Sequence, residues 1–192
     1  MDGLYYIPVG RGYKEVSFDE YIAISALTKE QDNRRVAFDS FQEFEVSTVF
    51  LSINHGFIPK GPGNNLPILY ETIIIENGEY GDMERYPTWD EAYFGHITTV
   101  ERILCKKINE NMLFEPITNL ESIITEVKEP HYYKNGRLFL DDGVNPPRAT
   151  FGLLNNIFYW RKFVEGPMKI NYTVGWIDIN NPKCDIMKII AS

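Results

Sequence analysis

The sequence has little of what builds metal sites and disulfide frameworks. Its 192 residues include two cysteines, Cys105 and Cys184, and three histidines. Two cysteines are too few for a disulfide framework or for a zinc site made of cysteines. Cys105 falls within a predicted helix, and we interpret it as a packing thiol. The sequence therefore implies no metal and no other cofactor.

Long apolar runs and a leader segment are also lacking. No run approaches the roughly 18 apolar residues that a membrane-spanning helix needs. The start, Met1-Asp2-Gly3, has neither the basic region nor the apolar region of a signal peptide. We therefore expect a protein of the cytoplasm, without a membrane partner.

Basic residues are outnumbered, with 19 Lys and Arg against 27 Asp and Glu and a formal net charge of −8. The acidic excess lies in residues 1–107, which hold 10 basic and 17 acidic residues, whereas residues 108–192 hold 9 and 10. Binding to a nucleic-acid duplex usually needs a basic face. The charge balance therefore argues against a duplex partner, while it leaves a homo-oligomer open.

Motifs of the common catalytic classes are absent as well. Gly10-Arg11-Gly12 is not followed by a phosphate-loop pattern, and the loop from Gly56 to Gly63 lacks the Gly-Lys-Ser/Thr that would complete one. The sequence also has no Gly-x-Ser-x-Gly nucleophile elbow. No motif in the sequence therefore indicates a particular enzymatic reaction.

What is present predicts an α+β fold with an α-β-β-β-α unit in residues 1–108. Capping boxes at Ser17–Glu20 and Thr88–Glu91 indicate the starts of two helices. Asn77-Gly78 indicates a tight turn. We expect a small antiparallel sheet covered by helices. The predicted elements are an edge strand over 4–8, a helix over 18–29, strands over 35–41, 44–53 and 66–76, and a helix over 89–108.

Residues 109–192 are predicted to form a β-rich C-terminal extension, which either stands apart or packs with the first unit as one domain. Asn135-Gly136 between two apolar and aromatic runs indicates a hairpin over 132–140. The other predicted elements are helices over 119–128 and 150–164 and a strand over 169–179.

Four segments of the first half resemble one protein family in order and spacing. These segments are Arg35–Ala37, Val46–His55, Leu69–Ile75 and Glu84–His96. They are similar to a family of small proteins of uncharacterised activity encoded in tailed-bacteriophage genomes. The resemblance covers about residues 4–105.

The chain departs from the family pattern at several positions. Ser52 and Asn54 stand where the family often has Gly and Asp, and the 57–66 loop differs in composition. The resemblance implies a phage protein expressed in a bacterial cytoplasm. In that context, a non-structural accessory role, such as countering host defence or redirecting host machinery, is our hypothesis.

The first candidate site combines His55, Glu71, Arg85 and His96. Glu71 lies on an apolar face of a predicted strand, where a buried carboxylate needs a partner that Arg85 or a histidine would supply. His96 interrupts the apolar stripe of the 89–108 helix. If the protein is an enzyme, His55, Glu71 and His96 are its expected acid–base residues. The alternative to a functional site is that these groups only hold a sheet and a helix together through an ion pair and hydrogen bonds.

The second candidate site is basic and aromatic, because rings interleaved with Arg and Lys can stack bases and pair phosphates. The alternative is that the charges only flank a core hairpin and an aromatic helix. The segments involved span 132–137 and 148–162. Together with two residues of the first site, the expected ligand-binding residues are Arg85, His96, Tyr133, Arg137, Arg148 and Arg161.

Three functions follow as hypotheses. The leading one is a non-enzymatic phage accessory protein that binds a host component, either a small nucleotide signal or a defence protein. The second is a nucleotide-processing enzyme with a His/Glu site. The third is a minor structural protein of the phage.

Overall fold

The computed structural model describes residues 4–27, 34–55, 66–108, 120–124, 126–143, 146–154, 156–164 and 171–192. The helices are α1 (Phe18–Leu27), α2 (Trp89–Ile108), the short 3-10 helix η1 (Leu120–Ser122) and α3 (Ile186–Ala191). The strands are β1 (Tyr5–Val9), β2 (Gly12–Val16), β3 (Arg35–Phe41), β4 (Phe44–Phe50), β5 (Tyr70–Glu76), β6 (Glu79–Tyr86), β7 (His131–Lys134), β8 (Arg137–Leu140), β9 (Ala149–Leu154), β10 (Ile157–Val164) and β11 (Asn171–Asp178).

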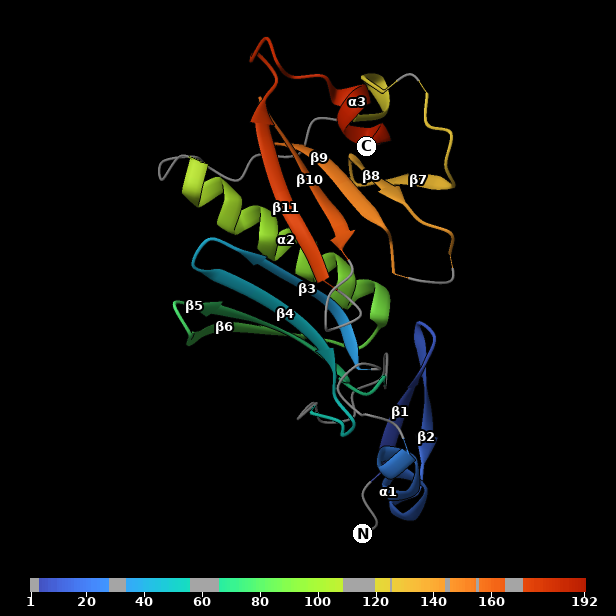
Figure 1. Ribbon diagram of the computed structural model, residues 1–192. Helices are drawn as coiled ribbons and strands as arrows, with labels where there is room; N and C mark the ends of the chain where they lie inside the picture. The colour runs from blue at the N-terminus through green and yellow to red at the C-terminus, as the bar shows by residue number, and fades with distance from the viewer. Residues whose placement is uncertain are drawn as a thin grey trace.

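One large sheet dominates this mixed α/β fold. Its nine strands lie in the order β6-β5-β4-β3-β11-β10-β9-β8-β7 (Figure 1). Neighbours are antiparallel except β3 and β11, which run parallel and are in register at Asp39 and Tyr172. The sequence predicted a small antiparallel sheet for the first half. Instead, both halves of the chain contribute to one mixed sheet, because β3 and β11 pair across more than a hundred residues.

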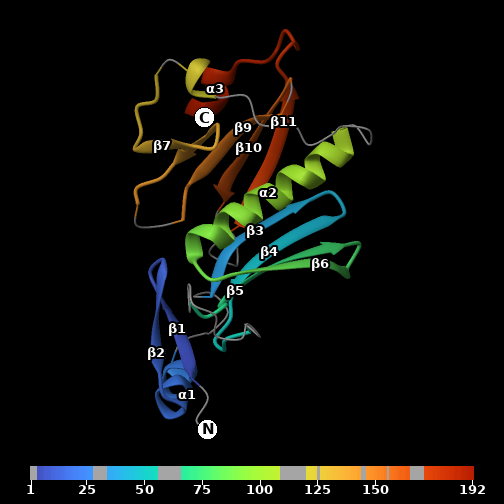
Figure 2. The ribbon, with the colours of Figure 1, turned by 180° about the vertical axis from the view of Figure 1, so that it is seen from behind.

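Helix α2 covers one face of this sheet along the line where β3 meets β11 (Figures 1 and 2). The predicted stripe of α2 is buried as a unit: Ala92, His96, Val100, Ile103 and Leu104. Its predicted counterpart on β4, with Val46, Thr48 and Phe50 on one face, is buried too. Both halves of the sheet therefore share the core under α2.

The opposite face of the C-terminal strands has its own cover. Leu138 and Leu140 pack in a cluster with Ile190 of α3, whereas Phe139 between them packs with the α2 core. Because side chains alternate along a strand, the two clusters lie on opposite faces of the sheet. The sheet is thus sandwiched between α2 and the pair α3 and η1 in this half. None of the described helices is long and apolar enough to span a membrane.

Strands β1 and β2 form a separate hairpin that attaches to the end of β4. The Tyr6 amide donates to the Ser52 carbonyl at 2.9 Å, and Tyr5 forms a bridge with Ile53. Helix α1 follows β2 and packs beside β1 through aromatic contacts, with Tyr5 and Tyr21 stacked at 5.1 Å. The tip of the hairpin points toward the α2–β8 region (Figure 1).

Local signals in the sequence are confirmed at most helix starts and turns. Ser17 and Glu20 form the reciprocal bonds of a capping box. The Glu91 amide donates to Thr88 Oγ1 at 3.2 Å. Asn77 and Asn135, each followed by Gly, take the left-handed conformation that two-residue hairpins require, with φ of 52° and 51°.

The predicted helix over 150–164 is wrong, because this segment forms β9 and β10. Its aromatic and β-branched residues favour an extended chain when they find cross-strand partners. Tyr159 lies opposite Gly152 in the ladder, and its ring covers the position that a Cβ on Gly152 would occupy. In 119–128 the described residues include only η1 as helix. Residue 119 and residue 125 lie outside the described ranges.

Strands β2 and β6 were not predicted from the sequence. Almost the whole of β6 is exposed, from Glu79 to Arg85, so no apolar alternation marks it. It is held by main-chain pairing with β5 at the edge of the sheet. The end of the predicted 18–29 helix falls outside the described residues.

Candidate functional site

The centre of the core is a buried ion pair between Asp39 of β3 and Arg161 of β10. The Arg161 Nε atom lies 3.0 Å from Oδ1 and 3.1 Å from Oδ2 of Asp39, and Nη2 donates to Oδ2. Neither side chain is exposed at all. The Arg161 guanidinium also lies 4.2 Å from the ring centroid of Tyr172 on β11. The ion pair therefore spans β11, the strand that lies between β3 and β10 in the sheet.

His96 of α2 joins the same carboxylate. Its Nε2 lies 2.5 Å from Asp39 Oδ2, and its Nδ1 lies 2.7 Å from Thr48 Oγ1. Thr48 in turn lies 2.6 Å from Thr72 Oγ1 on the next strand. One network of hydrogen bonds therefore connects α2 with the four strands β3, β4, β5 and β10 beneath it.

The protonation states follow from this geometry. Burial raises the pKa of Asp39, but the charge of Arg161 and the bond from His96 lower it by more, so the carboxylate is ionised. Burial lowers the pKa of His96 by more than Asp39 raises it. The imidazole is then neutral, donates from Nε2 to Asp39 and accepts at Nδ1 from Thr48, which accepts from Thr72. The side chains of this network thus satisfy one another within the core.

A second buried ion pair lies one helical turn further along α2. Arg137 of β8 donates from Nε to Glu101 Oε1 at 2.6 Å and from Nη2 to Oε2. This bidentate pair has side-chain exposures of 6% and 0%. Two of the four arginines that were expected to bind a ligand, Arg137 and Arg161, thus neutralise buried carboxylates.

Of the four residues of the first candidate site, only Glu71 and Arg85 come together. His55 is exposed beyond the end of β4, whereas both ring nitrogens of buried His96 are occupied by Asp39 and Thr48. Glu71 alternates with Thr72 on β5 and so points away from α2. The predicted partner of Glu71 is confirmed, because Arg85 Nε donates to Glu71 Oε2 at 2.8 Å.

The remaining expected ligand-binding residues are scattered. Arg148 is exposed and pairs with Glu129. Tyr133 packs on the cluster around Leu120 and Leu138, on the face of the sheet away from α2. Among the described residues, no group of three or more His, Cys, Asp and Glu side chains is placed to hold a metal ion.

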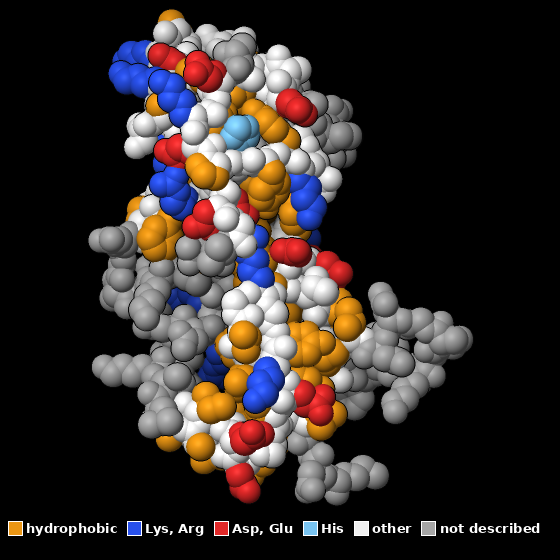
Figure 3. Space-filling model, turned by 90° about the vertical axis from the view of Figure 1, so that its right-hand side faces the viewer, with side chains coloured by type: hydrophobic (Ala, Val, Ile, Leu, Met, Phe, Trp, Pro, Cys, Tyr) orange, Lys and Arg blue, Asp and Glu red, His pale blue; other side chains and the backbone are white. Residues whose placement is uncertain are grey.

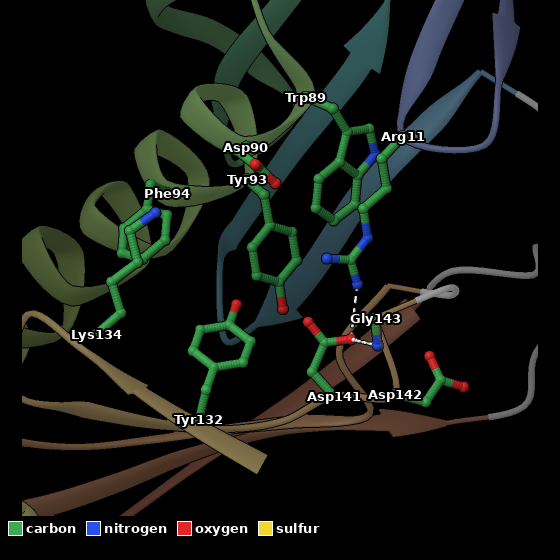
Figure 4. A pocket seen from close by; sticks show the side chains of 10 residues that line it. All are labelled: Arg11, Trp89, Asp90, Tyr93, Phe94, Tyr132, Lys134, Asp141, Asp142 and Gly143. Carbon is green, nitrogen blue, oxygen red and sulfur yellow. Dashed lines mark hydrogen bonds and ion pairs between the residues drawn. The ribbon is translucent and has the colours of Figure 1, made fainter. Parts of the chain in front are cut away.

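A cavity of about 450 Å³ opens where the β1–β2 turn, the start of α2, strand β7 and the segment after β8 meet (Figure 4). Four of its lining residues are aromatic and five are charged. They are Arg11, Trp89, Asp90, Tyr93, Phe94, Tyr132, Lys134, Asp141, Asp142 and Gly143. We call this space the junction cavity, because these four segments of the fold form its walls.

Arg11, at the tip of the β1–β2 hairpin, closes one end of the junction cavity. Its Nη2 donates to Asp141 Oδ1 at 2.7 Å, and its guanidinium lies 4.6 Å from the Trp89 ring centroid. The Gly143 amide donates to the same Asp141 oxygen at 2.8 Å. Burial lowers the pKa of Arg11, but the bond to Asp141 together with the charges of Asp141 and Asp90 raises it by more. The two charges neutralise each other at this end.

The other side of the junction cavity is formed by β7 and the second turn of α2. The Tyr132 ring stacks on Phe139 at 4.8 Å, and Lys134 Nζ lies 3.8 Å from the ring centroid of Phe94. Burial, together with the charge of Asp141, raises the pKa of Tyr132. Its hydroxyl is therefore protonated and is directed into the cavity toward Tyr93 (Figure 4).

Tyr93 connects the cavity with the buried charges. Its ring stacks on Trp89 with centroids 5.1 Å apart. Its hydroxyl accepts from Arg161 Nη1 at 3.3 Å and lies 3.4 Å from Thr150 Oγ1. Arg161, which lies outside the cavity, therefore fixes the position of a cavity wall.

None of the expected ligand-binding residues lines the junction cavity. Tyr132 and Lys134 were within the basic and aromatic segments, but Arg11 and Trp89 were not considered as site residues. A basic residue between two glycines at a hairpin tip was the available signal for Arg11. Its partner Asp141 lies 130 positions away, so sequence spacing could not reveal the contact.

No protein-family model, curated protein or solved structure matches this chain.

Proposed function

We propose that the protein is a non-enzymatic accessory protein of a tailed phage, which binds a small planar ligand of the nucleotide class in the junction cavity. The observation that carries this proposal is the cavity itself. Its volume of about 450 Å³ is within the usual range for small-molecule sites, about 300–1,000 Å³. Aromatic walls with a few convergent polar groups are typical of such sites.

The polar groups of the cavity suit a ligand with both flat and polar parts. Tyr132 directs its hydroxyl toward the centre, and Lys134 and Arg11 lie on opposite sides of Tyr132 and Tyr93 (Figure 4). The Tyr93 hydroxyl is already engaged by Arg161 and Thr150. The faces of aromatic rings and cationic side chains are the groups with which proteins hold nucleobases and phosphates. On the face shown in Figure 3, basic, acidic and hydrophobic side chains are intermixed. A discrete small ligand suits that face better than a long nucleic-acid backbone.

Binding without turnover is favoured because the residues of the enzyme hypothesis lie apart. His96 is sealed in the core with both nitrogens engaged, and His55 stands in solvent at the end of β4. The phage source and the role against host defence rest on the family resemblance of residues 4–105. In that context the ligand is a nucleotide signal of the host.

The test is to incubate the purified protein with a panel of nucleosides, nucleotides and cyclic oligonucleotides. The free pool is analysed by chromatography with mass detection before and after heat denaturation. A binder removes one ligand from the free pool and returns it intact on denaturation. A ligand that returns as a new species would replace this proposal with an enzyme, and an unchanged pool in both samples would refute it.

A pair of adjacent tyrosines provides matched variants. Tyr132→Phe removes a hydroxyl from the junction cavity, whereas Tyr133→Phe removes one from the opposite face of β7. We expect the first change to weaken binding several-fold and the second to leave it unchanged. Equal effects of the two variants would mean that the ligand binds elsewhere.

A further inference from the structure

The charges around the junction cavity are unequal in their availability to a ligand. Arg11 and Asp141 are already bound to each other, and the side chain of Asp141 is only 1% exposed. Asp142 directs its carboxylate away from the centre of the cavity (Figure 4). The charged groups that remain along the walls are Lys134 on β7 and Asp90 in the first turn of α2.

These two groups carry opposite charges and flank the aromatic wall. Asp90 lies beside Tyr93 at the α2 side, and the Lys134 ammonium lies over Phe94 (Figure 4). Both residues are exposed at the rim, so a ligand can reach them from solvent. An ammonium pairs with an anionic group of a ligand, and a carboxylate accepts hydrogen bonds from an amine.

We infer that the junction cavity selects a nucleoside monophosphate whose base carries an exocyclic amino group, with the phosphate at Lys134 and the amine at Asp90. This inference rests on the proposed function and specifies which nucleotides the cavity would bind. The Tyr132 hydroxyl, which lies on β7 two residues from Lys134, donates to the phosphate or the sugar. The base lies beside Asp90 and the half-buried ring of Phe94.

The same charges disfavour longer phosphate chains. One cation outside the Arg11–Asp141 pair matches one phosphate group, and each further phosphate would add negative charge beside Asp90 and Asp141 in a protein with a net charge of −8. Like charges brought close together lower affinity. A nucleoside triphosphate is therefore expected to bind more weakly than the monophosphate.

Isothermal titration with matched ligands tests this assignment. Adenosine and inosine monophosphates differ by amine against carbonyl on the base, as do cytidine and uridine monophosphates. Adenosine and adenosine triphosphate vary the phosphate. We expect at least one amino-bearing monophosphate to bind ten-fold or more tightly than its carbonyl partner, than its nucleoside and than its triphosphate.

Two variants separate the two contacts. Lys134→Met should reduce the affinity for the monophosphate to that for the nucleoside and leave nucleoside binding unchanged. Asp90→Asn should abolish the preference for the amine over the carbonyl partner. Lys183→Met and Asp82→Asn change the same residue types at exposed positions outside the cavity, and both should bind like the wild type.

The outcomes distinguish the two proposals. If the wild type binds none of these ligands or any other nucleotide, the proposed function fails. If it binds nucleotides but prefers triphosphates or carbonyl bases, or if Lys134→Met and Asp90→Asn leave the selectivity unchanged, the proposed function stands and this inference is overturned.

Discussion

Replacing Asp39 by Asn is the sharpest test of how the core is held together. The substitution keeps the size of the side chain and removes the charge that neutralises Arg161. Because Arg161 is fully buried among β3, β10 and β11, its guanidinium cannot regain the lost interaction from water. Breaking a buried ion pair by removing one partner costs roughly 3–5 kcal/mol. We expect a loss of this size.

The hydrogen bonds of the site point to the upper part of that range. Asp39 accepts from two nitrogens of Arg161 and from His96, whereas the amide of Asn offers one acceptor oxygen and two donor hydrogens. An NH₂ group would then face the donors of Arg161 or of His96. Since domains are stable by about 5–15 kcal/mol, the variant would lose a large part of its stability.

Urea unfolding followed by tryptophan fluorescence measures the effect, with a shift in midpoint at constant slope indicating a pure loss of stability. Glu71→Gln is the control, because it breaks the Glu71–Arg85 pair, in which the Arg85 side chain is 40% exposed. Exposed pairs contribute about 0–1 kcal/mol. If Asp39→Asn lowered the free energy of unfolding by less than about 1 kcal/mol, as Glu71→Gln should, the variant would not leave Arg161 as a buried, uncompensated charge, and the reasoning would be refuted.

Three further changes test other features of the fold. Because burial lowers the pKa of His96, only the unfolded chain takes up its proton near the ordinary pKa of about 6.5. Stability should therefore fall as the pH drops from about 6.5 toward 5, and His96→Gln should flatten this slope in urea titrations at each pH. The Tyr159 hydroxyl is buried without a hydrogen-bond partner in the described part of the chain, so Tyr159→Phe should raise the free energy of unfolding by about 1 kcal/mol. A Cβ at Gly95 would lie 2.0 Å from the Tyr86 hydroxyl, so Gly95→Ala should lower the melting temperature, because overpacking of about 1–3 kcal/mol exceeds the roughly 1 kcal/mol gained in helix propensity.

Local features of the fold could be predicted from the sequence because their causes are local. The Asn-Gly pairs at 77–78 and 135–136 and the capping boxes at Ser17 and Thr88 act through neighbouring residues. The helix predicted over 150–164 failed because an aromatic run has no period of its own that excludes a strand. Its extended form depends on cross-strand partners such as Gly152 for Tyr159.

Long-range pairing is the part of the fold that the sequence could not reveal. Strand β3 lies beside β11 through a parallel contact in register at one residue pair, Asp39 and Tyr172. Nothing in either segment indicates this neighbour. That contact joins both halves of the chain in one sheet, and it also places α2 over the boundary between β3 and β11.

The two buried charges, Asp39 and Arg161, are recognisable in the sequence as charged residues within largely apolar segments, but Arg161 was predicted to bind a ligand. Asp39 lies in the apolar run Arg35–Phe41, and Arg161 lies in the aromatic run Ile157–Val164. A charge within such a run must be neutralised if the run is buried. The aromatic surroundings of Arg161 were taken as a ligand site, although an acidic residue in another apolar strand was the better indication of its partner.

The position of the ion pair explains why a charged group is kept in this core at all. Apolar side chains of similar volume are often as stabilising as a buried ion pair, so net stability alone does not account for Asp39 and Arg161. Their bond bridges β11 beside the residue pair, Asp39 and Tyr172, at which the described parts of β3 and β11 are in register. A shifted pairing of β3 with β11 would separate the two charges. The same Arg161 holds the hydroxyl of Tyr93, the residue that forms the wall of the junction cavity. The buried charges therefore fix how the two halves of the sheet join, and through Tyr93 they fix one wall of the junction cavity.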